Sequence, residues 1–237
     1  MNRKVLAEYH YNLKPVERGY NRRTLYINVG TKQIIEKPVS DFMIDKFVGG
    51  KGFDLYLMWH GVKDSTKWND PENEICVSFG PLCGNTSYPG SGKSIVTTIS
   101  PLTGIPVDCN VGGHFGPYTK FSGWDALEIQ GKADEEIIVF IDGDKGIVQI
   151  LTAPDEHINS HILAEDLTKE FADSEDKHQS VSVVSTGEAA NHVLITCVNF
   201  SFWDKRRKVA RLKQAGRGGT GTVFRDKKIK ALVVKYS

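Results

Sequence analysis

The sequence has no apolar run that approaches the ~20 residues of a membrane-spanning helix, so we predict no membrane span. It also has no excess of either charge, because 30 Lys and Arg residues face 29 Asp and Glu residues. Such a balance argues against a dedicated nucleic-acid surface, which needs clustered positive charge. Residues 1–23 contain neither an apolar core nor a small-residue cleavage site. We therefore predict no signal peptide and a cytoplasmic protein.

Cysteine is scarce and irregularly spaced. The four cysteines stand at positions 76, 83, 109 and 197, and none forms a CxxC pair. These gaps fit neither a zinc ribbon nor an iron–sulfur cluster. We expect reduced, mostly buried thiols and no zinc or cluster site formed by this chain alone.

Glycine, in contrast, is plentiful and clustered. The chain has 237 residues, and many of its 23 glycines cluster at 49–52, 80–92, 112–116 and 216–221. Such clusters are typical of backbone that turns sharply or approaches another group closely. The length fits one large domain or two small ones.

Alternating and β-branched segments dominate the rest of the chain. They predict strands at 23–29, 33–37, 74–79, 94–99, 126–129, 136–142, 146–151, 180–185, 192–199 and 229–235. Apolar residues at helical spacing predict a helix over 161–171, and shorter helices are expected at 42–48 and 53–60. Residues 1–20 form a polar, weakly patterned lead-in, and the basic segment 205–213 is helix-like. Many strands with scattered helices predict an α+β fold.

Two glycine-rich segments resemble phosphate-binding motifs without fulfilling them. Residues 88–94 (YPGSGKS) lack the upstream glycine of a P-loop and continue as a strand pattern rather than a helix. Residues 216–221 (GRGGTG) match the letters of the dinucleotide fingerprint, but a helix-like segment precedes them and the chain has no acidic residue about 20 positions on. Each segment is either a plain glycine turn or an anion site, the second with Lys213 and Arg217 beside a nest of N–H groups.

Two further groups of residues have no assigned chemistry. His157 and His161 stand four residues apart without a Glu at 158, which favours a solvent-facing pair over a metal site. The basic run at 205–211 is either a solvated face or, beside the glycine nest, an anion-binding or subunit contact. No Ser-His-Asp or Cys-His set follows from spacing, so we assign no catalytic residue to this chain.

Several blocks in order carry a resemblance to a known family. They are residues 79–82 (FGPL) with 89–93 (PGSGK), 100–104 (SPLTG) with 110–116 (NVGGHFG), 121–126 (FSGWDA) and 215–221 (AGRGGTG). Together they resemble the N-terminal domain of the tungsten-containing aldehyde ferredoxin oxidoreductase family. The resemblance covers residues 22–237 as one domain and leaves residues 1–21 as an N-terminal extension.

The resemblance implies a fold and a cofactor. The family's domain has two β-sheets with few helices, and they form a saddle that carries a tungsten (or molybdenum) bis-pterin cofactor, with a magnesium ion between the pterin phosphates. By resemblance, the cofactor-facing positions are Lys93, Asn110, Gly112, Lys213, Gln214, Ala215, Gly216 and Arg217. Asn110 and Gln214 match positions whose backbone carbonyls complete the magnesium shell, as hard oxygen ligands for a hard cation.

The sequence departs from the family pattern in two respects. Lys93 and Lys213 stand where the family commonly has arginine. Lysine keeps the positive charge but loses the planar guanidinium that can donate two parallel hydrogen bonds to a phosphate. In addition, the family's [4Fe–4S] cysteines and acid–base residues lie in later domains. We therefore expect a separate small subunit whose larger partner carries the cluster and most of the substrate pocket; a piece of a longer chain is the other interpretation.

The resemblance implies an oxidoreductase subunit that is catalytic only with its partner. The expected reaction is oxidation of an aldehyde to a carboxylic acid, with electrons passed to a ferredoxin-like protein. One alternative is a subunit of a tungsten-dependent aryl-CoA reductase, which acts on an acyl-CoA substrate. Another is a non-catalytic cofactor carrier built on an orphaned domain.

Overall fold

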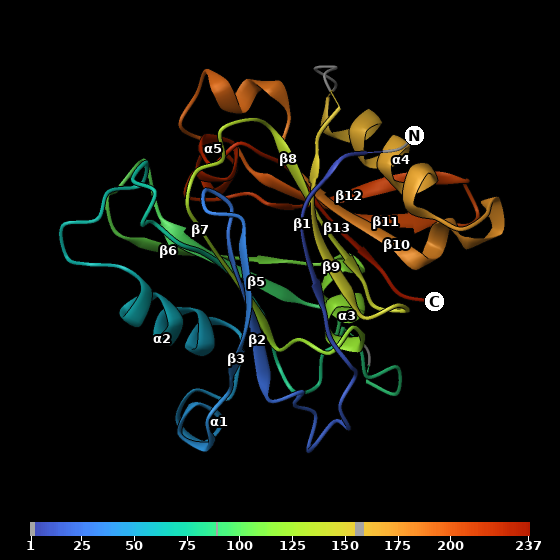
Figure 1. The fold of residues 1–237 in the computed structure, drawn as a ribbon, viewed down its shortest axis with the longest axis horizontal. Coiled ribbons are helices and arrows are strands. Elements are labelled where there is room, and N and C mark those ends of the chain that lie inside the picture. Colours follow the sequence, from blue (N-terminus) through green and yellow to red (C-terminus); the bar gives the residue numbers. More distant parts are fainter. Residues whose placement is uncertain (1–2, 89, 155–158) are drawn as a thin grey trace.

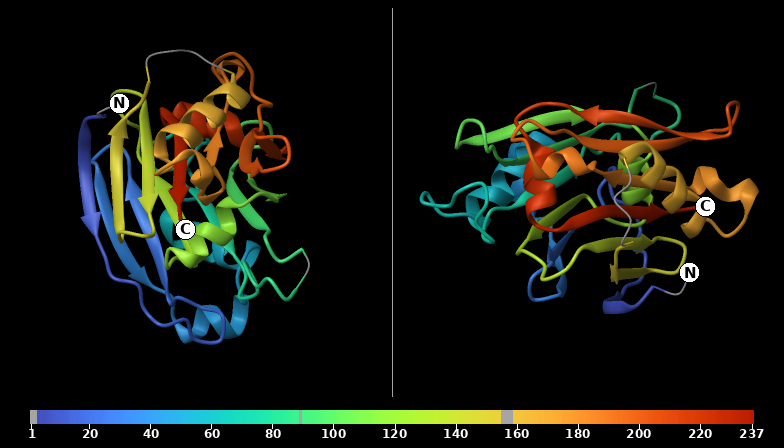
Figure 2. Two further views of the ribbon diagram at one scale, coloured as in Figure 1. Left: turned by 90° about the vertical axis from the view of Figure 1, so that its right-hand side faces the viewer. Right: turned by 90° about the horizontal axis from the view of Figure 1, so that it is seen from above.

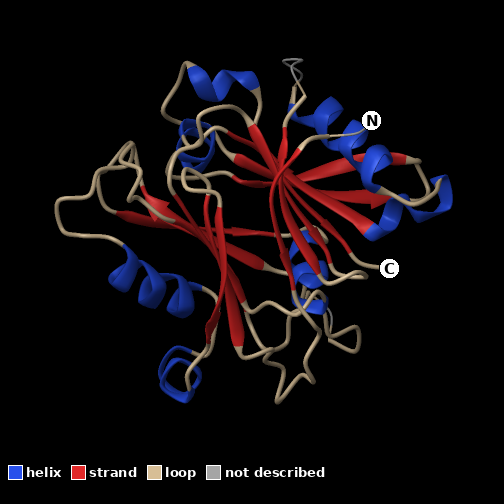
Figure 3. Cartoon of the chain, in the orientation of Figure 1, coloured by secondary structure: helices blue, strands red, loops and turns tan. Residues whose placement is uncertain are grey.

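The structure, a computed structural model, describes residues 3–88, 90–154 and 159–237 (Figure 1). Pro89 of the 88–94 loop and His157 of the histidine pair lie outside the described residues. Within these ranges the strands form two mixed sheets, of seven and six strands. The prediction of an α+β fold with two sheets and few helices is confirmed (Figure 3).

The larger sheet contains the two ends of the described chain. Its order is β1 (Val5–His10), β9 (Ile147–Thr152), β8 (Ile137–Asp142), β13 (Ile229–Lys235), β10 (Val181–Ser185), β11 (Val198–Asp204) and β12 (Val209–Ala215). The pair β13 and β8 is parallel, and the other neighbours are antiparallel. β12 is therefore an edge strand.

The smaller sheet is built from the first half of the chain. Its order is β3 (Gln33–Pro38), β2 (Arg23–Asn28), β7 (Ala126–Gln130), β4 (Ile75–Phe79), β5 (Ser94–Ile99) and β6 (Pro106–Val111). Only the pair β2 and β7 is parallel among these neighbours in the described structure. β6 is an edge strand, and it contacts edge strand β12 of the larger sheet.

The main core lies between the two sheets, and helices cover their outer faces (Figure 2). Alternation along β8 sends Val139 and Ile141 into this core, whereas Ile138 and Phe140 pack on the other side. There they meet α4 (Ser160–Phe171). The outer face of the smaller sheet packs against α1 (Asp41–Phe47) and α2 (Lys51–Gly61). Burying both faces of each sheet explains why so many strands are apolar throughout.

The remaining helical segments are short and connect the strands. They are α3 (Phe115–Phe121), η1 (Glu175–Ser180), η2 (Glu188–Asn191) and α5 (Thr220–Asp226). Within the described ranges, we find no helix with the length and apolar character needed to cross a membrane.

Three sequence-based expectations need correction. Segment 205–213 is no helix. Asp204 accepts hydrogen bonds at 3.1 Å from the backbone amides of Arg206 and Arg207, and these bonds stabilise a turn that connects β11 to β12. The predicted strand at 192–199 begins only at Val198, since residues 193–195 are exposed and join no sheet. The polar lead-in contains β1, which the sequence pattern did not predict and which pairs with β9.

The first correction changes the context of residues 216–221. A strand, β12, precedes this glycine-rich turn and a helix, α5, follows it, as in a dinucleotide site. However, three successive antiparallel pairings separate β12 from β13, so these two strands run in opposite directions. A dinucleotide fold needs a parallel crossover there, so the topology agrees with the sequence argument against it.

Candidate functional site

The glycine loops singled out in the sequence meet where β6 contacts β12. The β5–β6 hairpin pairs Ser94 with Val111 and thereby brings Lys93 beside Gly112. β12 contributes Lys213 from the other sheet. Since edge strands of both sheets supply these residues, closing the two-sheet core is what assembles the site.

A pocket of about 340 Å³ opens at this junction. Its lining residues are Gly90, Gly92, Lys93, Gly112, Gly113, His114, Phe202 and Lys213. Three of the eight residues predicted to face a cofactor, Lys93, Gly112 and Lys213, therefore line one pocket. The other five are not among its lining residues.

Gly112 lies between the two lysines. A Cβ atom at this position would stand 3.9 Å from Lys93 Nζ and 3.8 Å from Lys213 Cγ, so any larger side chain would fill the space between them. Both lysine side chains are exposed, and neither makes an ion pair within the described part of the chain. The arrangement offers two ammonium groups beside open backbone, which suits a negatively charged group.

Gly113 and Gly218 are glycines for steric reasons. Gly113 has φ +106°, and a Cβ there would lie 3.2 Å from the carbonyl oxygen of Ser201. Gly218 has φ +70°, and its Cβ would lie 2.5 Å from Val107 of β6. Both positions are strained for any other residue, and both hold the two sheets close at the junction.

The other predicted positions extend from the pocket along the β6–β12 junction. Asn110 lies on β6 opposite Ile95, and Gln214 lies on β12 opposite Asn199; both are exposed. Gly216 and Arg217 are also exposed, in the turn after β12.

Ala215 differs from these neighbours. Its side chain is fully buried in the main core, and its carbonyl accepts a hydrogen bond from Thr220 Oγ1 at 3.2 Å. Its methyl group therefore points away from the solvent and from any ligand at this surface.

His114 and Phe202 complete the pocket and were not among the residues predicted to face the cofactor. Their rings lie 5.6 Å apart, and Lys213 Nζ lies 5.7 Å from the centre of the Phe202 ring. His114 Nδ1 is 3.2 Å from the hydroxyl of Tyr118, and burial lowers the pKa of this histidine. A neutral imidazole at neutral pH is the result. In the sequence, the block NVGGHFG at residues 110–116 was the feature that could have drawn attention to His114.

The aromatic residues near the loops divide into two groups. Phe115 and Phe200 are fully buried and pack edge to face in the main core, with ring centres 5.6 Å apart. Tyr118, Phe202 and Trp203 are half-buried. Only this second group has side-chain surface available to a ligand or another chain.

The domain thus has two mixed sheets, with glycine loops and two lysines at the junction between them. The chain matches the family model "Aldehyde ferredoxin oxidoreductase, N-terminal domain" over residues 24–236. It belongs to the aldehyde ferredoxin oxidoreductase family, as the sequence blocks predicted.

Comparison with individual proteins agrees with this assignment. The chain is 34% identical over 218 residues to the tungsten-containing aldehyde ferredoxin oxidoreductase of Pyrococcus horikoshii, covering 92% of this chain and 33% of that protein. It is 29% identical over 227 residues to the aliphatic sulfonate oxidoreductase, WOR-like subunit, of Pyrococcus furiosus, covering 92% of this chain and 35% of that protein.

A solved structure shares the fold. The chain resembles part of the active-site complex BamBC of benzoyl coenzyme A reductase with 1,5-dienoyl-CoA, with a TM-score of 0.77 and 26% identity. The match covers 92% of this chain and 31% of that chain. The chain thus spans about a third of the length of the relatives it matches.

Proposed function

We propose that this chain is the cofactor-binding part of a tungsten- or molybdenum-dependent bis-pterin oxidoreductase. The observation that supports it most directly is the position of Lys93 and Lys213 on either side of Gly112, in a pocket where both sheets meet. A pterin cofactor carries phosphate groups, and ammonium groups beside unobstructed backbone suit such groups. The residues present therefore fit the cofactor that the family implies.

Each candidate residue has a proposed task. Lys93 and Lys213 neutralise phosphate charge, while Gly112 and Gly216 leave the backbone open to close approach. Arg217 adds an exposed guanidinium in the turn after β12. Asn110 and Gln214 are proposed to hold magnesium through their backbone carbonyls, and Ala215 is proposed to contribute backbone only, because its side chain is buried. When bound, the metal of such a cofactor supplies two-electron redox chemistry.

The proposed reaction is oxidation of an aldehyde to a carboxylic acid, with electrons passed to a ferredoxin-like acceptor. Relatives named as tungsten-containing aldehyde ferredoxin oxidoreductases support it. A second candidate is reduction of an aryl-CoA, which the structural similarity to benzoyl coenzyme A reductase favours. Because these relatives are about three times longer, we propose a larger partner that supplies the [4Fe–4S] cluster and the catalytic residues.

Metal analysis of the native complex tests the proposal. The chain is tagged in its own host under anaerobic conditions, and the purified material is analysed for tungsten, molybdenum and iron and for co-purifying chains. Tungsten or molybdenum with iron and a larger chain is the expected result. Dye reduction with aldehydes, compared with that for aryl-CoA substrates, then separates the two reactions. A folded, metal-free chain without a partner would leave only the non-catalytic interpretation.

A further inference from the structure

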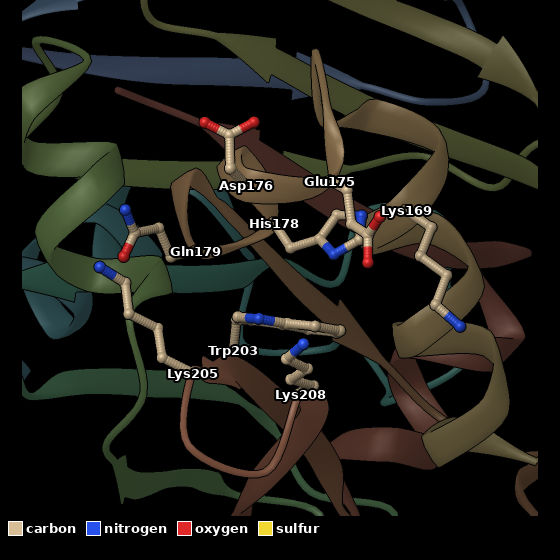
Figure 4. A pocket seen from close by; sticks show the side chains of 8 residues that line it. All are labelled: Lys169, Glu175, Asp176, His178, Gln179, Trp203, Lys205 and Lys208. Atoms are coloured by element: carbon tan, nitrogen blue, oxygen red, sulfur yellow. The ribbon is translucent and has the colours of Figure 1, made fainter.

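A second and larger pocket, of about 700 Å³, lies on the other face of β11. Its lining residues are Lys169, Glu175, Asp176, His178, Gln179, Trp203, Lys205 and Lys208 (Figure 4). Phe202 lines the first pocket and Trp203 lines the second, as expected for successive strand residues that point to opposite faces. None of the residues predicted to face the cofactor lines this second pocket.

Trp203 and His178 form the inner wall of this pocket. Their ring centres are 4.6 Å apart with the planes at 65°, so the edge of one ring meets the face of the other. His178 is only 8% exposed, yet its Nδ1 atom has no hydrogen-bond partner among the described residues. A buried ring nitrogen without a partner costs free energy, which a ligand that reaches this nitrogen can recover.

Two lysines come from the turn that follows β11. The backbone amide of Lys208 donates to the Asp204 carbonyl at 2.7 Å and fixes this turn. The Asp204 carboxylate pairs with Arg207 at 2.9 Å and with Arg211 at 3.6 Å. Asp204 thus pairs with arginines rather than with the two lysines of the turn. Lys205 and Lys208 make no ion pair in the described part of the structure, whereas Lys169 pairs with Glu165 at 2.7 Å.

Hydrogen-bond acceptors also line the pocket. Glu175 and Gln179 come from η1, while Lys205 and Lys208 come from the β11–β12 turn, and the Trp203 ring lies between these two segments in Figure 4. The pocket thus combines a flat aromatic surface with ammonium groups and hydrogen-bond acceptors around it. An inorganic anion alone would use only the lysines.

We propose that this pocket binds a nucleoside phosphate whose base carries an exocyclic amine, such as an adenine nucleotide. The base lies against Trp203, the amine donates to Glu175 or Gln179, and the phosphates contact Lys205 and Lys208. The volume lies within the range of about 300–1,000 Å³ typical of small-molecule sites. An adenine nucleotide occurs both free and as part of coenzyme A, so either compound could supply the group that binds here. The inference is independent of the proposed pterin site, since the two pockets share no lining residue.

Isothermal titration tests this inference on the full chain in its purified complex, with ATP, AMP, adenosine, pyrophosphate and coenzyme A as probes. At least one of ATP, AMP and coenzyme A should bind with a Kd below about 1 mM, and both adenosine and pyrophosphate should bind at least about tenfold more weakly. Stronger binding of coenzyme A than of ATP, weakened by Trp203→Leu, would identify coenzyme A as the source of the nucleotide in this pocket; the reverse order would identify a free nucleotide.

Variants distinguish a specific site from surface attraction. Trp203→Leu and the exposed-turn variant Lys208→Glu should each weaken nucleotide binding about tenfold or more. The matched controls Trp59→Leu and Lys63→Glu, at exposed positions elsewhere, should bind like the original protein. The inference is wrong if no nucleotide or coenzyme A binds at about 1 mM, if pyrophosphate binds as tightly as ATP, or if Lys208→Glu has no effect. Metal content measured on the same samples shows separately whether the proposed function fails.

Discussion

The backbone amide of Arg217 donates a hydrogen bond to Sγ of Cys109 over 3.1 Å. This contact ties the turn after β12 to strand β6, one residue before Asn110. It explains how residues about 100 positions apart in the sequence come to share one surface. Cys109 is buried, so its sulfur is shielded from water and acts as the acceptor for this amide.

Replacing Cys109 by Val should destabilise the junction. The Val side chain offers no acceptor, so the Arg217 amide loses its partner at a cost of about 1 kcal/mol, measured as a lower Tm. Cys109→Ser is the matched control, because a hydroxyl still accepts the bond. If Cys109→Val melts no lower than the original protein, the sulfur contact does not hold the turn.

Replacing Lys93 or Lys213 by Gln should reduce the tungsten content of the assembled complex. A hydrogen bond to a charged group contributes about 1.5–3 kcal/mol, so the affinity for the cofactor should fall about tenfold or more and the tungsten content should fall with it. The conservative variants Lys93→Arg and Lys213→Arg keep the charge and should retain the metal. Lys63→Gln, an exposed lysine in the loop after α2, serves as the control. Unchanged metal content in both glutamine variants would rule out the assignment of these lysines.

Glu74 provides a prediction about pH and stability. It is fully buried, neither carboxylate oxygen has a hydrogen-bond partner among the described residues, and burial, reinforced by nearby Glu128, raises its pKa to about 7. Its ordinary pKa, near 4.3, applies in the unfolded chain. The folded state therefore binds the proton more tightly, and this contribution to stability is lost as pH rises from about 4.3 to about 7.

Replacing Glu74 by Gln removes the ionisable group and should raise the Tm at pH 8. The gain in the free energy of unfolding is at most about 4 kcal/mol and should vanish near pH 4.5, where the glutamic acid is already neutral. Glu135→Gln, at an exposed position, should show no such pH-dependent gain. A Glu74→Gln protein that is equally destabilised at both pH values would show that the buried carboxylate makes a contact the structure does not reveal.

The sequence predicted the elements whose pattern is local and periodic. The spacing of Leu163, Leu167 and Phe171 was enough for α4, and the β-branched run of β5 was enough for a strand. It failed at β12, where five basic side chains over 205–211 obscured the alternation and the strand is held by pairing with β11. β1 is also defined by its partner, because its half-buried pattern is weak on its own.

The candidate site was only partly accessible from the sequence. Lys93, Gly112 and Lys213 converge because β6 and β12 are edge strands that meet, and sheet order cannot be deduced from periodicity. Their grouping came from the family resemblance instead. His114 was missed because a single histidine in a glycine-rich block has no spacing that assigns it a role, and its contact with Tyr118 exists only in the folded chain.

The last prediction concerns the proposed larger partner, which should cover an apolar surface beside the site. Two loops expose apolar side chains and meet around Gly219, where an added Cβ would contact Leu194 and Pro101. The exposed side chains are Leu102, Ile105, Val193, Leu194 and Ile195, and Ile105 and Ile195 are 61% and 68% exposed. Exposed apolar side chains on neighbouring loops are candidates for an interaction site. The occupant we propose is the partner that supplies the two-thirds of the relatives' length not matched by this chain.

Binding of that partner should stabilise this chain by mass action, so its Tm should rise with partner concentration. Replacing Ile105 and Ile195 together by Ser should weaken the complex while leaving the Tm of the solitary chain nearly unchanged, because both side chains are already largely in water. Leu55→Ser, at an exposed apolar position on α2, is the control. Size-exclusion chromatography and melting curves of the chain with and without its genomic neighbour provide the measurement. A double variant that binds the partner as well as the original chain would place the interface elsewhere on the molecule.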